Sequence, residues 1–309
     1  MSMLTLEETL AAITPADQGA MERARRHWDS LAKPLGGLGA VEDAVVRIAG
    51  MTGSPKVDLS RRAVVVMCAD NGVVCEGVTQ TGQDVTAIVT ENMCRAASSV
   101  CLMARCAHAD IVPVDIGVAR PVSGEKILQR CVRRSTGNIA KGPAMTRGEA
   151  VEAVTAGIRL VQELKEQGYR LLATGEMGIG NTTTSSAVVS ALLGVAPRQV
   201  TGRGAGLSSE GLERKIRAIE SALAVNRPNP ADPLDVLSKV GGLDIAGLTG
   251  VFLGGAALHI PVLVDGFISS VAALLAVRLC PAAADYMLGS HVSGEPSGEL
   301  VLDALGLKP

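Results

Sequence analysis

The chain has 309 residues, of which 47% are hydrophobic and 19% are charged. A chain of this length and apolar content buries a large core, which excludes intrinsic disorder as its main state. The formal net charge of −2 and the aromatic content of 2% are unlike the basic surfaces and stacked rings of nucleic-acid-binding proteins. We therefore expect one large domain, with or without a small appendage, and no nucleic-acid partner.

The N-terminal sequence and the cysteine pattern favour a cytoplasmic location. The N-terminus carries Glu7 and Glu8 where an export signal would be basic and then apolar. The seven cysteines lie between Cys68 and Cys280 without a C-x-x-C pair, as suits a reducing cytoplasm. No His or Cys shows metal-ligand spacing, so we expect neither a metal nor a cofactor. The histidines are His27, His108, His259 and His291.

In chain order, apolar runs typical of buried strands occur at residues 63–67, 109–114, 169–173 and 260–264. Helical spacing fills residues 85–107, 147–167 and 208–225 between them. Strands that alternate with helices predict an α/β fold, with a parallel sheet covered by helices on both faces. Residues 1–49 look helical and lack any strand run, and residues 281–309 also look helical, so we expect a small helical domain from the two chain ends beside a sheet domain of residues 50–280.

Residues 245–264 contain no Asp, Glu, Lys or Arg over a length that can cross a bilayer. Four glycines, His259 and Pro261 interrupt the stretch, and Asp244 and Asp265 flank it. We expect a buried helix that ends near His259, followed by a buried strand, and no membrane span.

The densest polar segment is residues 175–184, GEMGIGNTTT, directly after the strand at 169–173. Its Asn and Thr residues favour capping of a helix that ends near Gly194, and its glycines let a ligand approach the backbone. A helix N-terminus suits a phosphate. The segment is neither a G-x-G-x-x-G dinucleotide fingerprint nor a P-loop. Spacing alone fits an ordinary strand-to-helix turn equally well.

Other segments carry weaker patterns. The loop at residues 201–206, TGRGAG, precedes a helix that Ser208 or Ser209 can cap, and Arg203 and Lys215 can neutralise a phosphate or simply face solvent. Glu176 ends a strand, where open α/β sheets bind ligands, and is either a base, a sugar-binding group or a carboxylate held by backbone N–H groups. Residues 70–72, DNG, also follow a strand and can form a turn.

Together, several segments resemble one family, the nicotinate-nucleotide:dimethylbenzimidazole phosphoribosyltransferases, over nearly the whole chain and in the family's order. The most specific match is GEMGIGNTTT. The matching segments are residues 31–42, 69–86, 138–150, 175–184, 201–215, 241–250, 260–268 and 290–296.

The resemblance implies a Rossmann-like parallel sheet, a small helical domain from both chain ends and a homodimer whose partner completes the site. It implies two catalytic glutamates, Glu295 in the S-H-x-S-x-E segment and Glu176. The phosphoribosyl-binding residues it implies are Gly178, Ile179, Gly180, Asn181, Thr182, Gly202, Arg203, Gly204, Gly206 and Lys215. For the base pocket, Gln83 matches a lining position, and we add Asp70, Ser290 and Gly294 from the neighbouring segments.

The implied reaction transfers the phosphoribosyl group of nicotinate mononucleotide to dimethylbenzimidazole, with inversion, for the lower ligand of cobalamin. The chain departs from the family's pattern at Asn71 and Gly298, where many members have histidine, and at Thr81 and Gly82, where aromatic residues are common. The acceptor therefore stays open between dimethylbenzimidazole, another benzimidazole, a purine and a phenol. A nucleotide-dependent oxidoreductase and a nucleotide-binding subunit without transferase activity are the competing interpretations.

Overall fold

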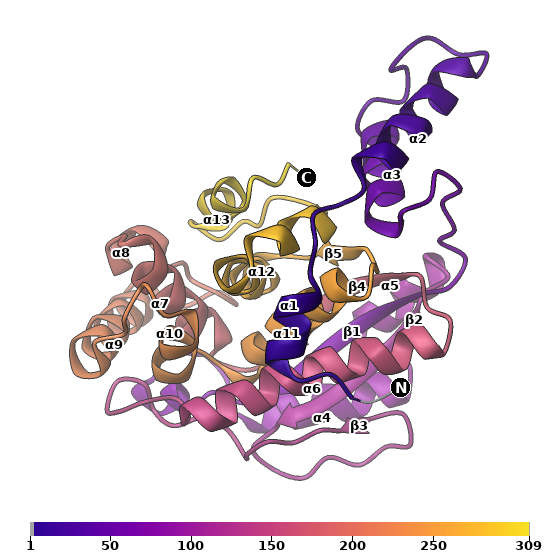
Figure 1. Ribbon diagram of the computed structural model, residues 1–309. Coiled ribbons are helices and arrows are strands. Elements are labelled where there is room, and N and C mark those ends of the chain that lie inside the picture. The colour runs from indigo at the N-terminus through magenta and orange to yellow at the C-terminus, as the bar shows by residue number, and fades with distance from the viewer. Residues whose placement is uncertain (1–2, 309) are drawn as a thin grey trace.

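The computed structural model describes residues 3–308, so residues 1–2 and 309 of the predicted terminal segments lie outside the described residues (Figure 1). Six strands form one parallel sheet in the order β3-β2-β1-β4-β5-β6, which confirms the predicted α/β fold with a Rossmann-like sheet. The strands are β1 (Arg62–Ala69), β2 (Asp110–Gly117), β3 (Leu128–Gln129), β4 (Leu171–Met177), β5 (Val262–Val264) and β6 (Met287–Gly289).

Helices cover both faces of this sheet. The α-helices are α1 (Leu6–Ala12), α2 (Gln18–Ser30), α3 (Ala40–Thr52), α4 (Asp84–Cys94), α5 (Ser99–Cys106), α6 (Arg147–Glu166), α7 (Asn181–Leu193), α8 (Pro197–Val200), α9 (Ser209–Asn226), α10 (Pro233–Val240), α11 (Leu243–Ala257), α12 (Phe267–Leu279) and α13 (Gly298–Leu305). Two 3₁₀ helices, η1 (Gly72–Glu76) and η2 (Pro281–Tyr286), follow β1 and precede β6.

Strand β1 shows why the sheet is buried on both sides. Successive side chains of a strand point to opposite faces. Val65 and Met67 pack into the large core with α6, α11 and α12, whereas Val66 and Cys68 pack into a smaller core with α4 and α5. A near-continuous apolar run is the pattern expected of such a strand.

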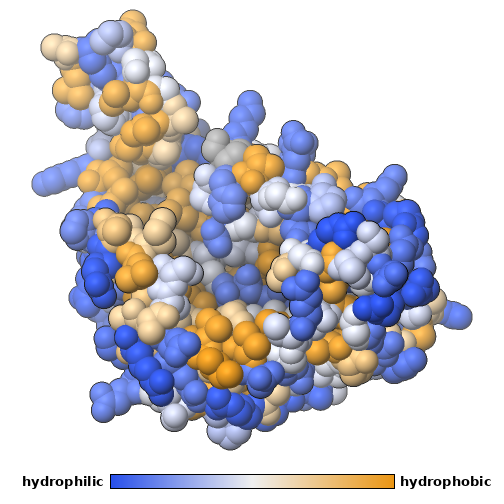
Figure 2. Space-filling model, turned by 180° about the vertical axis from the view of Figure 1, so that it is seen from behind, coloured by the Kyte–Doolittle hydropathy of each residue, from blue (hydrophilic) through white to orange (hydrophobic). Residues whose placement is uncertain are grey.

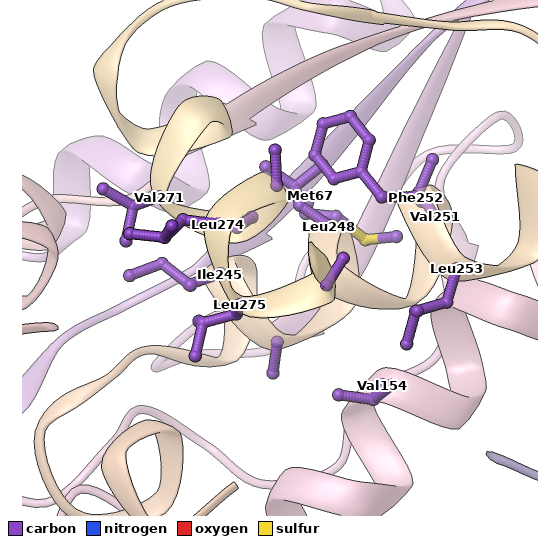
Figure 3. Close-up of a cluster of buried hydrophobic side chains, with 14 of the residues drawn as sticks. Met67, Val154, Ile245, Leu248, Val251, Phe252, Leu253, Val271, Leu274 and Leu275 are labelled. Carbon is purple, nitrogen blue, oxygen red and sulfur yellow. The ribbon is translucent and has the colours of Figure 1, made fainter. Parts of the chain in front are cut away.

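Helix α11 is the centre of the large core. Its side chains, Phe252 among them, meet Met67 from β1, Val154 from α6 and Leu274 from α12 (Figure 3). The expectation of a buried helix followed by a strand is confirmed, because α11 ends at Ala257 and β5 follows. No helix within residues 3–308 is long and apolar enough to cross a membrane.

Two sequence predictions of secondary structure were wrong. Residues 85–107 form two helices, because Ala96 adopts a left-handed conformation (φ 54°) after α4 ends and α5 starts anew at Ser99. Residues 281–309 are not helical throughout, because 287–289 extend the sheet as β6 beside β5. Strands of two or three residues, such as β3 and β6, are too short to give a periodic pattern.

The helices α2 and α3 pack on each other and project from the rest of the molecule (Figure 1). We call residues 18–52 the arm. Its base is tied to the C-terminal segment, since Arg47 Nη2 donates to the carbonyl of Met287 at 2.7 Å. Helix α13 packs on α12. The division into residues 1–49, 50–280 and 281–309 stays a prediction.

Candidate active site

A cavity of about 240 Å³ opens at the carboxyl end of β4. It brings together the two glycine loops that the sequence singled out and a segment, residues 78–81, that follows η1. Its lining residues are Val78, Thr79, Gln80, Thr81, Glu176, Met177, Gly178, Ile179, Gly180, Asn181, Thr182, Arg203, Gly204, Ala205, Leu207 and Lys215. Nine of these were predicted site residues, and Gly202 and Gly206 adjoin them in the second loop.

Sequence reasoning missed seven lining residues: Val78, Thr79, Gln80, Thr81, Met177, Ala205 and Leu207. The amide of Gln80 reaches across to the second glycine loop and donates to the carbonyl of Gly206. The only sequence clue was that residues 78–80 lie inside the matching segment 69–86. Their place in the cavity depends on η1, which turns the chain back from β1 toward the loop at 201–206.

The first glycine loop leads into α7. The prediction that Asn or Thr side chains cap this helix was wrong. Gly180 is the N-cap in a left-handed conformation (φ 93°), and Asn181 is the first helical residue. The Asn181 side chain cannot cap because it faces two carboxylates instead. Within residues 3–308 no side chain caps α7, so its positive N-terminal dipole is left for a ligand in the cavity.

Glu176 lines the cavity at the end of β4. Its carboxylate accepts a hydrogen bond from the Asn181 amide, which also donates to Asp244 Oδ2 at 3.0 Å. Burial, reinforced by repulsion from Asp244, raises the pKa of Glu176 to about 8. Burial also raises the pKa of Asp244, to about 6. The site therefore holds a carboxyl group that keeps its proton near neutral pH.

Lys215 brings a buried cation to the same cavity. It lies on α9, is fully buried, and its Nζ donates to Thr182 Oγ1 at 2.8 Å and to the carbonyl of Gly202 at 3.1 Å. Burial lowers the pKa of Lys215 to about 8, while the negative charge of Glu295 opposes that shift. Arg203 also lines the cavity, with its guanidinium held by the carbonyl of Leu207 at 2.7 Å.

Glu295 is beside this cavity, close enough to Lys215 for their charges to interact. Its Oε2 is buried and has no hydrogen-bond partner in the described part of the chain. The loop that carries it is fastened at its end, because Ser297 Oγ donates to the carbonyl of Val200 at 3.2 Å. Gly202 makes room for the carboxylate, since a Cβ at this position would lie 2.0 Å from Glu295 Oε2.

The four residues predicted for the base pocket do not line this cavity. Asp70 is fully buried and accepts from Thr86 Oγ1 at 2.6 Å and from the Ala119 N–H at 2.8 Å. Gln83 donates to Ser135 Oγ at 2.9 Å. Ser290 Oγ donates to the carbonyl of Val264 at 2.7 Å, and Gly294 is exposed. Their role in binding a base stays a prediction.

Among the described residues, no group of three or more His, Cys, Asp or Glu side chains is arranged to hold a metal ion. The chemistry that this cavity offers consists of a cation, a helix N-terminus and carboxyl groups.

Residues 13–309 match the family model DBI_PRT, which is described as a phosphoribosyltransferase. The chain belongs to this phosphoribosyltransferase family. Helix N-termini and buried cations are the groups that bind phosphate in proteins, as a phosphoribosyltransferase requires. Membership confirms the resemblance found in the sequence and the assignment as a transferase, and it sets aside the oxidoreductase interpretation.

Curated relatives are similar over almost their whole length. The nicotinate-nucleotide–dimethylbenzimidazole phosphoribosyltransferase of Ruminiclostridium cellulolyticum is 47% identical over 99% of this chain and 87% of its own. The enzyme of the same name from Acetivibrio thermocellus is 50% identical over 98% of this chain and 87% of its own.

A solved structure agrees in fold. The crystal structure of the nicotinate-nucleotide-dimethylbenzimidazole phosphoribosyltransferase of Thermus thermophilus superposes with a TM-score of 0.89 at 40% identity. It covers 95% of this chain and 87% of that one. The similarity therefore extends through the sheet and the helices that carry the cavity.

Proposed function

We propose that this phosphoribosyltransferase moves the phosphoribosyl group of nicotinate mononucleotide to dimethylbenzimidazole. The products are nicotinate and α-ribazole 5′-phosphate, the nucleotide of the lower ligand of cobalamin. The observation that carries the proposal is the unpartnered, buried Oε2 of Glu295 beside a cavity that holds Lys215 and the N-terminus of α7. The names of the relatives give the substrates.

The cavity suits the phosphoribosyl part of the substrate. Lys215 and the first turn of α7 supply positive charge for one phosphate, and Gly204, where an added Cβ would face Thr182 and Lys215, lets the sugar approach the backbone. At about 240 Å³ the cavity is smaller than the roughly 300–1,000 Å³ typical of sites that enclose a whole drug-sized ligand. The acceptor base therefore borders this cavity and extends beyond it toward the Glu295 loop.

The reaction needs one base. One nitrogen of the benzimidazole attacks C1 of the ribose, and the bond from C1 to the pyridinium nitrogen breaks. Its electron pair returns to the nicotinate ring, which leaves uncharged at that nitrogen. The second benzimidazole nitrogen loses its proton to Glu295 Oε2, a step that contributes roughly 100- to 10,000-fold. Attack opposite the leaving group inverts C1 and gives the α-nucleotide.

The acceptor is the least constrained part of the proposal. No aromatic side chain lines the cavity among the described residues, and its apolar wall includes Val78, Met177 and Leu207. Flexible, polarisable Met and aliphatic side chains contact a flat ring without fixing its identity as stacked aromatic rings do. Another benzimidazole, a purine or a phenol is therefore the second candidate acceptor.

We further propose a homodimer that forms through the arm. The loop between α2 and α3 exposes Leu35 by 76% and Leu38 by 53%, and Val41 at the start of α3 is 61% exposed. Figure 2 shows hydrophobic side chains on the arm and where it joins the rest of the molecule. Exposed apolar patches mark interaction sites, and the resemblance implies a second copy as the partner.

To test the function, the purified protein is incubated with nicotinate mononucleotide and a panel of acceptors. Nicotinate and the new nucleotide are followed by mass spectrometry. We expect α-ribazole 5′-phosphate with dimethylbenzimidazole as the best acceptor. A faster reaction with a purine or phenol would move the assignment to that acceptor. Mononucleotide binding without product from any acceptor would favour a subunit that only binds nucleotide.

A further inference from the structure

Asp244 is a fully buried carboxylate that no step of the proposed reaction uses. It lies in the first turn of α11, and its Oδ2 accepts from the Asn181 amide at 3.0 Å. The same amide nitrogen donates to Glu176, which lines the cavity. The two carboxyl groups are thus joined through one amide, with Glu176 on the ligand side and Asp244 behind it.

The space around this pair is tightly filled. A Cβ at Gly178 would lie 2.6 Å from Asp244 Oδ2 and 3.1 Å from Asn181 Nδ2. A Cβ at Gly242 would lie 2.5 Å from Asp244 Oδ1. Side chains at either position would push the carboxylate away from the amide. The arrangement therefore depends on glycine at two positions that are distant in sequence.

The surroundings decide which carboxyl group keeps a proton. Asp244 accepts two N–H groups, from Asn181 and from the Ile245 backbone, and lies at a positive helix end. Glu176 accepts only the Asn181 hydrogen bond within residues 3–308. More donors stabilise the ionised form, so the negative charge resides on Asp244 and the proton on Glu176.

Other charged groups face the pair. Asp265 adds a negative charge near Glu176, and Asp70 adds one near Asp244, so both oppose a second ionisation. The cations Lys215 and Arg203 line the same cavity but are already engaged by Thr182 and by the carbonyl of Leu207. The raised pKa of Glu176 agrees with this balance.

We propose that Asp244 is a positioning residue whose charge adds to burial in keeping Glu176 protonated as a hydrogen-bond donor to an oxygen of the bound mononucleotide, while the Asn181 amide joins the two carboxyl groups. The proposal rests on the proposed function for the identity of that ligand. Both carboxyl groups cannot ionise side by side in a buried site, so the pair carries one proton near neutral pH. Glu176 contacts the ligand, and Asp244 acts only through it.

The test is a carboxyl ¹³C NMR titration of the full chain with ¹³C-labelled glutamate, in which the Glu176 signal is assigned by its absence from Glu176→Gln. We expect Glu176 to titrate near pH 8 in the wild type. Asp244→Asn removes the neighbouring charge but not the burial that is the larger cause, so it should lower this midpoint by about 1 pH unit without restoring the ordinary value. Asp244→Ser serves the same purpose if the first variant does not fold.

Two outcomes overturn the proposal: a wild-type Glu176 that titrates near its ordinary value, or a midpoint that neither Asp244 variant moves. If Asp244 had only a structural role, its substitution would change the thermal stability of the protein and leave the titration midpoint of Glu176 where it is. The pH dependence of kcat/KM for nicotinate mononucleotide, measured in parallel, should fall with the same midpoint as Glu176 in each protein. Loss of the proton of Lys215 could also lower kcat/KM in this pH range. The variant Lys215→Arg distinguishes the two causes, because arginine stays charged throughout this range.

This design separates the proposal from the proposed function. The titration needs no substrate, so the expected midpoints without any transfer would refute the function and leave the carboxyl pair standing. Transfer activity with an unperturbed Glu176 would do the reverse.

Discussion

Gly202 shows how one missing side chain defines the site. Its Cα borders Glu295 Oε2, and its carbonyl accepts from Lys215 Nζ. Gly202→Ala would place a methyl group 2.0 Å from the carboxylate and displace it from the cavity. We predict a loss in kcat of at least about 100-fold, the lower range for a lost general base, with the fold retained. Turnover and circular dichroism check this.

A second glycine-to-alanine substitution serves as a control for effects that any such substitution has on activity. Gly142 has no atom within 4 Å of an added Cβ and lies outside the cavity. Gly142→Ala should keep wild-type turnover. Equal activity in the two variants would contradict the role given to Gly202.

Glu176 also predicts a pH dependence of stability. Its pKa is about 8 in the folded protein and about 4.3 in an unfolded chain, so between these values the folded state binds the extra proton. Its contribution to stability is complete below about pH 4.3 and is lost as pH rises through 8. Between pH 5 and pH 8, the free energy of unfolding measured with urea should fall more for wild type than for Glu176→Gln. Equal losses would argue against a protonated Glu176.

At the residue scale, sequence reasoning found the groups that belong to recognisable segments and missed their partners. Glu176, Asn181 and Lys215 were predicted and line one cavity. Asp244 was not predicted as a site residue, because nothing in its local sequence indicates that α11 starts beside α7. The contact between Gly202 and Glu295 likewise depends on the loop that returns from β6.

At the scale of elements, α6 and α11 approach closely because glycines line their contact. A Cβ at Gly250 would lie 1.9 Å from the carbonyl oxygen of Val154, and one at Gly157 would lie 2.1 Å from that of Gly247. Gly250→Ala must push the helices apart in the centre of the core. We predict a loss of about 1–3 kcal/mol or more in the free energy of unfolding, measured with urea.

The control lies in the same pair of helices. Gly148 is exposed in the first turn of α6, with only Thr146 Oγ1 within 4 Å of an added Cβ. Gly148→Ala should raise the free energy of unfolding by about 0.4–1 kcal/mol, because alanine reduces the entropy of the unfolded chain. If Gly250→Ala and Gly148→Ala changed the free energy of unfolding in the same direction, the role given to glycine in the α6–α11 contact would be wrong.

Periodicity predicted the long elements well and the short ones poorly. The helices at 147–166 and 209–226 and the strand at 62–69 lie within a few residues of their predicted ranges. The break between α4 and α5 was missed because the apolar spacing continues through it, while a left-handed Ala96 has no sequence signature. Strand β6 was missed because its three residues owe their conformation to pairing with β5.

At the scale of the whole molecule, the arm gathers exposed apolar side chains, Leu35, Leu38 and Val41, in one short stretch of chain. The sheet buries its apolar side chains on both faces, whereas helix α5 also exposes Leu102 and Met103. The double variant Leu35→Ser and Leu38→Ser should shift the protein from dimer to monomer in analytical ultracentrifugation. Val225→Ser removes a similarly exposed side chain, 54% exposed, from α9 and should not. A wild type that sediments as a monomer would refute the homodimer.

Glu295 removes the acceptor's proton during phosphoribosyl transfer in the proposed reaction. The most direct measurement compares wild type and Glu295→Gln for the release of nicotinate from the mononucleotide in the presence of dimethylbenzimidazole. Glutamine keeps the shape of the side chain but cannot accept the proton. We expect Glu295→Gln to lower kcat by roughly 100- to 10,000-fold at unchanged affinity for the mononucleotide. Wild-type turnover in Glu295→Gln would contradict it.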